Sequence, residues 1–339
     1  MKNIKDDFVR WGIIGVGDVC EVKSAPAMQI IEGSELVAVM RRNGEKAADY
    51  AKRHRVPKWY SNADQLINDP KVNAVYIATP PNAHEEFTVK AAQAGKPVYV
   101  EKPMARSTSE CQSMVNVCAA NNVPLYVAYY RRCLPNFEKL RSLIDEKVIG
   151  DIRLVKIELY KTLDPDIVAD ITATMETNWR IDPEVAGGGY FFDLAAHQLD
   201  YLDYALGPIK SVNGIASNQG GFYKAADIIS SSWIHENGIV GNGSWCFTSS
   251  MSSQKDIMTL IGSTGKITIS FFGAPQISIE RDNQPVEVLN FDLPKHIQQP
   301  LIQTVVDDLL GKGKCPSTGE SALRTNWAME QMTRGYYER

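Results

Sequence analysis

Residues 11–20, WGIIGVGDVC, begin in an apolar run and then turn at two closely spaced glycines. Gly15 and Gly17 match the first two glycines of a Gly-x-Gly-x-x-Gly turn. In that turn the first glycine permits a tight bend, and the second lets the backbone approach a pyrophosphate. Cys20 stands at the third position, where a small residue lets helix and strand pack closely. We therefore predict a dinucleotide-binding turn here, and a packing role for Cys20 in place of a reactive thiol.

The residues that follow this turn open a helix. Backbone N–H groups at a helix start attract phosphate oxygens, so we expect Asp18 and Val19 to contact the cofactor together with the two glycines. The place of the motif at the first strand-to-helix junction supports this interpretation.

Outward from the turn, short continuous apolar runs alternate with amphipathic stretches. Strands are expected at Val9–Ile14, Glu35–Met40, Val72–Ala78, Pro97–Val100 and Leu125–Ala128, and helices at Val19–Ile31, Glu45–Arg53, Ala83–Ala94 and Ser107–Asn121. Continuous apolar runs separated by helices are typical of a parallel sheet covered on both faces. We predict an N-terminal α/β domain over residues 1–130, a Rossmann-type doubly wound parallel sheet. Composition alone does not exclude the alternative of a doubly wound fold that binds no dinucleotide.

The pattern changes after Tyr130. A helix is expected at Asn136–Glu146, then longer alternating strands at Ile152–Tyr160, Ser211–Ala216, Ser230–His235, Gly241–Thr248, Asp256–Ile261, Lys266–Ser270 and Gln276–Arg281, and a last helix at Ser321–Gly335. Alternation is typical of antiparallel strands with one buried face. We predict an α+β domain over residues 131–339, with a large, mostly antiparallel open sheet that binds substrate and mediates self-association. Because an open sheet with outward apolar residues favours burial of that face, we expect a homodimer or homotetramer.

Composition excludes several function classes. The chain has 339 residues, more than the ~250–300 that one hydrophobic core usually serves, so two domains are expected. A net charge of −4 implies no broad basic face, and nucleic acid is not an expected partner. None of the six cysteines forms a Cys-x-x-Cys pair, so we expect neither a metal site nor a disulfide framework. No apolar run approaches the ~18 residues of a membrane span, and the charged N-terminus is unlike a signal peptide, so a cytoplasmic protein is expected.

Two arginines follow the second predicted strand. An NAD-preferring site usually has an acidic residue here, which binds the ribose 2′-hydroxyl. This chain has Arg41 and Arg42 instead, and a guanidinium pairs well with the 2′-phosphate of NADP. We therefore expect NADP as the cofactor in preference to NAD. A solvated basic loop is the alternative.

Three further segments suggest a family. They are ATPPNAH at residues 78–84, GKPVYVEKP at residues 95–103 and GGGYFFDLAAH at residues 187–197. With the glycine turn, they closely resemble the Gfo/Idh/MocA oxidoreductases, which include glucose–fructose oxidoreductase and inositol dehydrogenase. The resemblance covers essentially the whole chain. It implies a catalytic lysine from Glu-Lys-Pro, matched by Lys102, and an aspartate and a histidine four residues apart, matched by Asp193 and His197.

The resemblance extends to other contacts. The family's Tyr-Arg-Arg and Trp-Arg segments are matched at residues 130–132 and 179–180. Further cofactor contacts are expected from Thr79, Pro80, Asn82, His84, Glu101, Lys102 and Arg131. Substrate contacts are expected from Lys102, Tyr130, Tyr160, Trp179, Arg180, Asp193 and His197. For His84, contact with the nicotinamide end and a simple place in the first helical turn are equal alternatives. For Trp179, a place in the core is the alternative.

The chemistry of the three catalytic candidates agrees with hydride transfer. Lys102 follows the carboxyl end of a predicted parallel strand, where open α/β sheets bind ligands. Its ammonium group would stabilise alkoxide character on the reacting oxygen. His197 would act as general acid or base, with Asp193 orienting it or holding the Lys102 cation. Exchanged proton roles for Lys102 and His197, and a helix-cap role for Asp193, stay open.

We therefore expect an NAD(P)-dependent oxidoreductase that moves a hydride to or from a sugar, a sugar-derived carbonyl, a polyol or a dihydrodiol. Two alternatives remain. One is a glycoside hydrolase that uses transient NAD-dependent oxidation. The other is a non-catalytic NAD(P)-binding regulatory protein.

Overall fold

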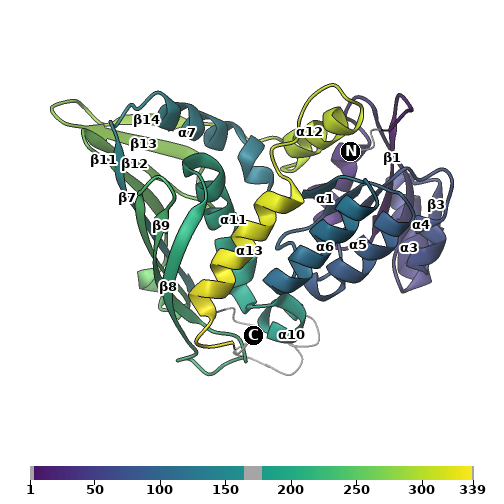
Figure 1. The fold of residues 1–339 in the computed structure, drawn as a ribbon, viewed down its shortest axis with the longest axis horizontal. Coiled ribbons are helices and arrows are strands. Elements are labelled where there is room, and N and C mark those ends of the chain that lie inside the picture. The colour runs from purple at the N-terminus through teal and green to yellow at the C-terminus, as the bar shows by residue number, and fades with distance from the viewer. Residues whose placement is uncertain (1–3, 164–177, 338–339) are drawn as a thin grey trace. The chain divides into compact units, whose positions relative to one another are not determined.

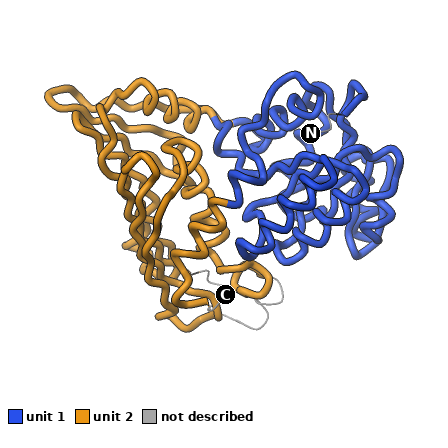
Figure 2. Tube along the Cα trace, viewed as in Figure 1, with its two compact units in different colours: residues 1–134, 294–323 blue, residues 135–293, 324–339 orange. Residues whose placement is uncertain are grey.

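The computed structural model describes residues 4–163 and 178–337 (Figure 1). The chain divides into two compact units. The first holds residues 1–134 and 294–323, and the second holds residues 135–293 and 324–339 (Figure 2).

The first unit contains a six-stranded sheet in the order β3-β2-β1-β4-β5-β6, and every neighbouring pair is parallel. The strands are β1 Val9–Ile14, β2 Ser34–Met40, β3 Lys58–Tyr60, β4 Ala74–Ile77, β5 Val98–Val100 and β6 Leu125–Val127. All residues of β4, β5 and β6 are buried, as continuous apolar runs predict. The predicted doubly wound parallel sheet is confirmed.

Short helices connect these strands. They are α1 Asp18–Val22, α2 Ala25–Met28, α3 Gly44–His54, α4 Ala63–Ile67, α5 His84–Gln93 and α6 Thr108–Ala120, with 3-10 turns η1 Pro81–Ala83 and η2 Tyr130–Cys133. Helices α5 and α6 pack side by side (Figure 1). The helix expected at Val19–Ile31 is two helices instead, because Pro26 lacks the N–H that a continuous helix needs and lies in the first turn of α2.

The segment 294–323 belongs to the first unit, although the sequence had placed everything beyond residue 130 in one second domain. Its helix α12, Gln299–Leu309, was not predicted. It buries Leu301, Ile302 and Val305 and packs against α2 and η2. An amphipathic pattern shows that a helix has a buried face, but it does not show which sheet that face covers.

The second unit contains an eight-stranded sheet in the order β14-β13-β12-β11-β7-β10-β9-β8. Its strands are β7 Ile152–Thr162, β8 Ile209–Ser217, β9 Ile228–His235, β10 Val240–Ser249, β11 Lys255–Gly262, β12 Gly265–Ile269, β13 Gln276–Arg281 and β14 Glu287–Asn290. Only the β7–β10 pair of this sheet is parallel, so the predicted mostly antiparallel sheet is confirmed. Its helices are α7 Pro135–Asp145, α10 Pro183–Ala186 and α11 Gly189–Leu206, with 3-10 turns η3 Trp179–Ile181 and η4 Met251–Ser253. The last helix, α13 Gly319–Thr333, contains the boundary between the units.

One face of this sheet is covered by α11 (Figure 1). Alternate residues of β7, namely Val155, Ile157 and Leu159, are buried on this helix face. The residues between them point to the outer face, because side chains alternate along a strand. The outer face carries the ion pairs of Glu158 with Lys156 and Lys255.

Candidate active site

The glycine turn has the predicted geometry. Gly15 follows β1 with a φ of +92°, and a Cβ there would lie 2.7 Å from Cγ2 of Thr79. Its N–H donates to the Met40 carbonyl at 2.9 Å, which joins the ends of β1 and β2. At Gly17, by contrast, a Cβ would meet no described atom within 4 Å. Gly15 is therefore required by the protein itself, whereas the open side of Gly17 leaves room for a ligand to approach the backbone.

Thr79 follows β4 beside this turn. Its hydroxyl oxygen Oγ1 is buried, and no hydrogen-bond partner for it exists among the described residues. Buried hydroxyls normally have a partner, so this atom suits a ligand that supplies one. The exposed Asn82 lies in η1, just beyond half-buried Pro80. The carboxyl edge of the parallel sheet therefore fits a dinucleotide at the positions that the sequence indicated.

His84 is not at the surface. It has no exposed area, and its ring nitrogens lie 2.8 Å from the Thr79 carbonyl and 3.1 Å from the Met104 carbonyl. Burial lowers the pKa of the ring, which favours the neutral form that donates one hydrogen bond. Of the two alternatives for His84, these contacts favour the structural place in the first helical turn, and contact with the cofactor stays a prediction. His84 connects the turn after β4 to the loop after Glu-Lys-Pro.

The arginines after β2 have different surroundings. Arg41 is half-buried, and its Nη1 donates to the Val16 carbonyl of the glycine turn at 3.3 Å. Arg42 is exposed. Arg41 therefore braces the turn, and Arg42 is the more accessible cation at the end of β2.

Glu101, directly after β5, is 8% exposed and is enclosed by hydrogen bonds. Tyr76 Oη and Gln298 Nε2 donate to its Oε1 at 2.5 and 2.6 Å, and the Lys102 N–H donates to its Oε2 at 3.2 Å. Tyr99 Oη in turn donates to Gln298 Oε1 at 3.0 Å. Both oxygens of Glu101 are thus engaged by the protein, which supports a role in positioning the turn of Lys102, and its contact with the cofactor stays a prediction.

Lys102 itself is half-buried at the carboxyl end of β5, and the Lys102–Pro103 peptide bond is cis. Gln298 reaches this turn from the segment just before α12. Sequence reasoning missed it, because nothing local marks a glutamine nearly 200 positions downstream as a partner of Glu101.

Tyr130 and Arg131 lie in η2 and are 9% and 7% exposed. Arg131 Nη1 donates to Tyr130 Oη at 3.0 Å, and its guanidinium lies 5.1 Å from the centre of the Tyr130 ring. The two predicted contact residues therefore form one packed pair within the first unit.

In the second unit, α11 carries Asp193 and His197 one helical turn apart. Arg180 Nε donates to Asp193 Oδ2 at 3.1 Å, and the Arg180 guanidinium stacks 4.4 Å from the centre of the Trp179 ring. Trp179 is half-buried, not core. The structure therefore brings together three predicted site residues from α11 and η3, and the observed ion-pair partner of Asp193 is Arg180.

His197 is 3% exposed, and its ring meets Phe272 edge-on at 6.2 Å between centres. The helix around it is held by polar contacts that the sequence did not reveal. Trp245 Nε1 donates to Gln198 Oε1 at 2.7 Å, and Arg324 forms a bidentate pair with buried Asp203 at 2.6 and 3.0 Å. These contacts fix the rotation of α11 and so the direction of its Asp193–His197 face.

Tyr160 does not lie on this face. It shares a hydrogen bond of 2.7 Å with Ser244 of β10, and both lie on the outer face, opposite Leu159 and Trp245. The substrate contact of Tyr160 stays a prediction, which its place on the outer face does not support. The alternation along β7 was visible in the sequence, but the face that α11 covers was not.

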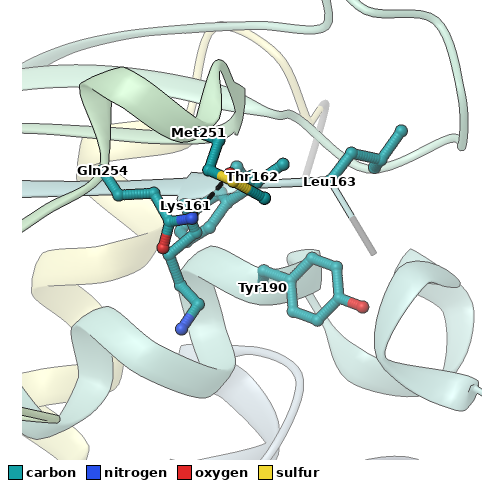
Figure 3. A pocket seen from close by; sticks show the side chains of 7 residues that line it. Lys161, Thr162, Leu163, Tyr190, Met251 and Gln254 are labelled. Carbon is teal, nitrogen blue, oxygen red and sulfur yellow. Dashed lines mark hydrogen bonds between the residues drawn. The ribbon is translucent and has the colours of Figure 1, made fainter. Parts of the chain in front are cut away.

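A pocket of about 380 Å³, which the sequence did not indicate, opens on the helix face of the second unit (Figure 3). It is lined by Lys161, Thr162, Leu163, Tyr190, Phe247, Met251 and Gln254.

Lys102 belongs to the first unit, and Asp193 and His197 belong to the second. The convergence of these three side chains therefore stays a prediction. Within the described ranges, no group of three or more His, Cys, Asp or Glu side chains is arranged to hold a metal. No helix of those ranges has the length and apolar character to cross a membrane.

Comparison with known families agrees with this geometry. Residues 9–129 match the family model of the oxidoreductase family with an NAD-binding Rossmann fold, and residues 137–268 match the GFO/IDH/MocA C-terminal domain. The chain belongs to the GFO/IDH/MocA family. This confirms the resemblance seen in the sequence and makes the protein an NAD(P)-binding oxidoreductase.

Relatives of this GFO/IDH/MocA protein include oxidoreductase P35 of Formosa agariphila, 37% identical over 95% of this chain and 97% of the relative. The trans-1,2-dihydrobenzene-1,2-diol dehydrogenase of Sus scrofa is 27% identical over 77% of this chain and 74% of its own. Among solved structures, levoglucosan dehydrogenase in complex with NADH and L-sorbose superposes with a TM-score of 0.85 at 20% identity, over 98% of this chain and 96% of that one. At 20% identity, the similarity to levoglucosan dehydrogenase shows a shared fold.

Proposed function

We propose that this protein transfers a hydride between NADP and a CH–OH or carbonyl group of a sugar-like substrate. The observation that carries the proposal is the hydrogen-bonded enclosure of Glu101, which holds Lys102 at the carboxyl end of β5. Ligands bind at this end of parallel strands in open α/β sheets. Relatives of the chain include a dihydrodiol dehydrogenase, a 1,5-anhydro-D-fructose reductase of Ensifer adhaerens and, by fold, levoglucosan dehydrogenase. Their substrates are cyclic alcohols or ketones.

The bound nicotinamide would accept or donate the hydride. Lys102 would place its ammonium group beside the substrate oxygen and stabilise the negative charge that develops there. His197 would take or give the hydroxyl proton. The carboxylate of Asp193 would neutralise the charge of Arg180 at that end of α11. Arg180 would bind the sugar hydroxyls, and Trp179 would pack against the face of the sugar ring.

NADP is the proposed cofactor in preference to NAD. Arg42 is an exposed cation at the end of β2, where the 2′-phosphate of NADP is recognised in this fold. Fluorescence titration with NADPH and NADH measures the preference directly. Tighter NADH binding, or an Arg42→Ala variant with unchanged NADPH affinity, would overturn this assignment.

The test of the activity is a change of absorbance at 340 nm over a screen of sugars, polyols and cyclic diols with both cofactors. A Lys102→Met variant should lose about 10²–10³-fold in kcat and still bind NADPH. Lys96 is the matched control, since it lies close in sequence and donates to the Asp69 carbonyl away from Glu101. No net redox turnover with any substrate, or full activity of Lys102→Met, would refute the proposal.

We also propose self-association through the outer face of the large sheet. Ile215, Ile234 and Val240 are 75%, 44% and 43% exposed there, and Ile234 lies directly opposite Val240. Burial of these side chains against a second copy would remove apolar surface from water.

A further inference from the structure

The pocket beside α11 has the size of a small-molecule site. Its volume of about 380 Å³ falls within the range of ~300–1,000 Å³ that is typical of ligand pockets. It lies at the end of β7, on the same face as Leu159, with Phe247 of β10 and Tyr190 of α11 as its apolar walls.

Tyr190 forms a rigid aromatic wall. Its ring packs edge-on against Tyr223 at 6.0 Å and tilted against Phe247 at 5.9 Å, and Asn178 Nδ2 donates to its hydroxyl at 2.8 Å. A ring held on three sides presents a fixed apolar surface at little entropic expense. Such a surface suits the C–H face of a sugar ring.

Lys161 supplies the positive charge of the pocket. Residue 161 shares the strand parity of Leu159, so it projects to the helix face, and Figure 3 shows its side chain extending from β7 on the side of Tyr190. No carboxylate within the described ranges forms an ion pair with it. Glu158 lies on the outer face and is engaged by Lys156 and Lys255. The amine is therefore available to an anionic ligand.

Two connections join the pocket to the candidate active site within the second unit. Tyr190 precedes Asp193 by three positions on α11, so the two side chains lie on adjacent parts of one helix face. Asn178, which binds Tyr190, also caps η3, from which Arg180 reaches Asp193. A ligand in the pocket therefore lies at the same end of α11 as the residues proposed to act on the substrate.

We propose that this pocket is a subsite for sugars that carry an anionic substituent, with Tyr190 against the ring and Lys161 as the specificity-determining cation. The proposal rests on the proposed function, because it names the substrate class of that oxidoreductase. A carboxylate, as in a uronic acid, and a sulfate ester offer the same charge to Lys161. Both are tested.

The experiment measures equilibrium binding by calorimetry to the full chain saturated with NADPH. The probes are glucose with glucuronate, galactose with galacturonate, and glucose 6-sulfate. We expect at least one anionic sugar to bind about tenfold tighter than its neutral counterpart, as a charge-assisted hydrogen bond provides. In Lys161→Met this preference should disappear, with the affinity for the neutral sugar unchanged.

Lys156→Met is the matched control, because Lys156 lies on the same strand but on the outer face. It should keep the preference. Tyr190→Ala should weaken neutral and anionic sugars alike. A carboxylate-only or sulfate-only preference identifies the anion and supports the subsite. Equal binding of neutral and anionic sugars, a preference that survives Lys161→Met, or no binding of any probe would overturn it.

An assay of NADP-dependent turnover at 340 nm on the same protein distinguishes the subsite proposal from the proposed oxidoreductase activity. Turnover of neutral sugars with no Lys161-dependent preference would overturn the subsite and keep the oxidoreductase. Lys161-dependent binding without turnover of any bound sugar would keep the subsite and overturn the oxidoreductase.

Discussion

Gln298 offers the sharpest test of how the Glu-Lys-Pro turn is held. Its side chain is fully buried, donates to Glu101 Oε1 at 2.6 Å and accepts from Tyr99 Oη at 3.0 Å. Gln298→Leu keeps the side-chain volume but removes both bonds. A hydrogen bond to a charged group contributes ~1.5–3 kcal/mol and a neutral one about 1 kcal/mol, so the variant should lose ~2.5–4 kcal/mol of unfolding free energy. At about 2–4 °C per kcal/mol, its Tm should fall by roughly 5–16 °C.

Thermal unfolding followed by circular dichroism, with and without NADPH, measures this loss. Gln299→Leu is the matched control, since its half-buried side chain forms no hydrogen bond within the described residues, and its Tm should change little. Under the proposed function, Gln298→Leu should also lower kcat more than it raises KM, because a displaced Lys102 stabilises the transition state less. A Tm within 1 °C or so of wild type would refute the reasoning, as would equal effects of the two leucine variants.

Three further outcomes are expected. Burial lowers the folded-state pKa of His84, so the unfolded chain takes up a proton more easily than the folded one. The free energy of unfolding should therefore fall as the pH drops below the ordinary histidine pKa of about 6.5. Between pH 7.5 and 5.5 the Tm of His84→Gln should fall less than that of the wild type, and equal losses would contradict this. Arg180→Ala should raise KM clearly, whereas Tyr160→Phe on the outer face should leave it unchanged; a KM effect confined to Tyr160→Phe would reverse the assignment of faces. Ile234→Lys should shift the sedimenting species toward monomer, and an unchanged sedimentation coefficient would argue against self-association through this face.

Local signals were accurate where a short stretch of chain decides its own conformation. The strands Val9–Ile14 and Gln276–Arg281 were predicted at their observed bounds. Ser107 caps α6 by accepting from the Glu110 N–H, as the Ser-x-x-Glu pattern indicates. The three-residue strand β3 was missed because its residues are only partly buried and show no apolar pattern.

In the candidate site, too, the sequence predicted the local features and not the contacts between distant segments. Gly15 adopts the positive φ that its motif demands, since that requirement is local. The surroundings of His84 and Glu101 are not local. Their observed partners lie on other elements, so the sequence does not indicate these hydrogen bonds.

The sequence by itself determined the two kinds of sheet, the glycine turn and the family, because each rests on spacing or motif within a short segment. Only the tertiary structure decided that α12 joins the first unit, that Tyr160 faces away from α11, and that Arg180 is the partner of Asp193. The periodicity of a sequence shows which residues share one face of a helix or strand. Which face is covered, and by what, depends on contacts between segments far apart in the chain, and no local pattern contains that information.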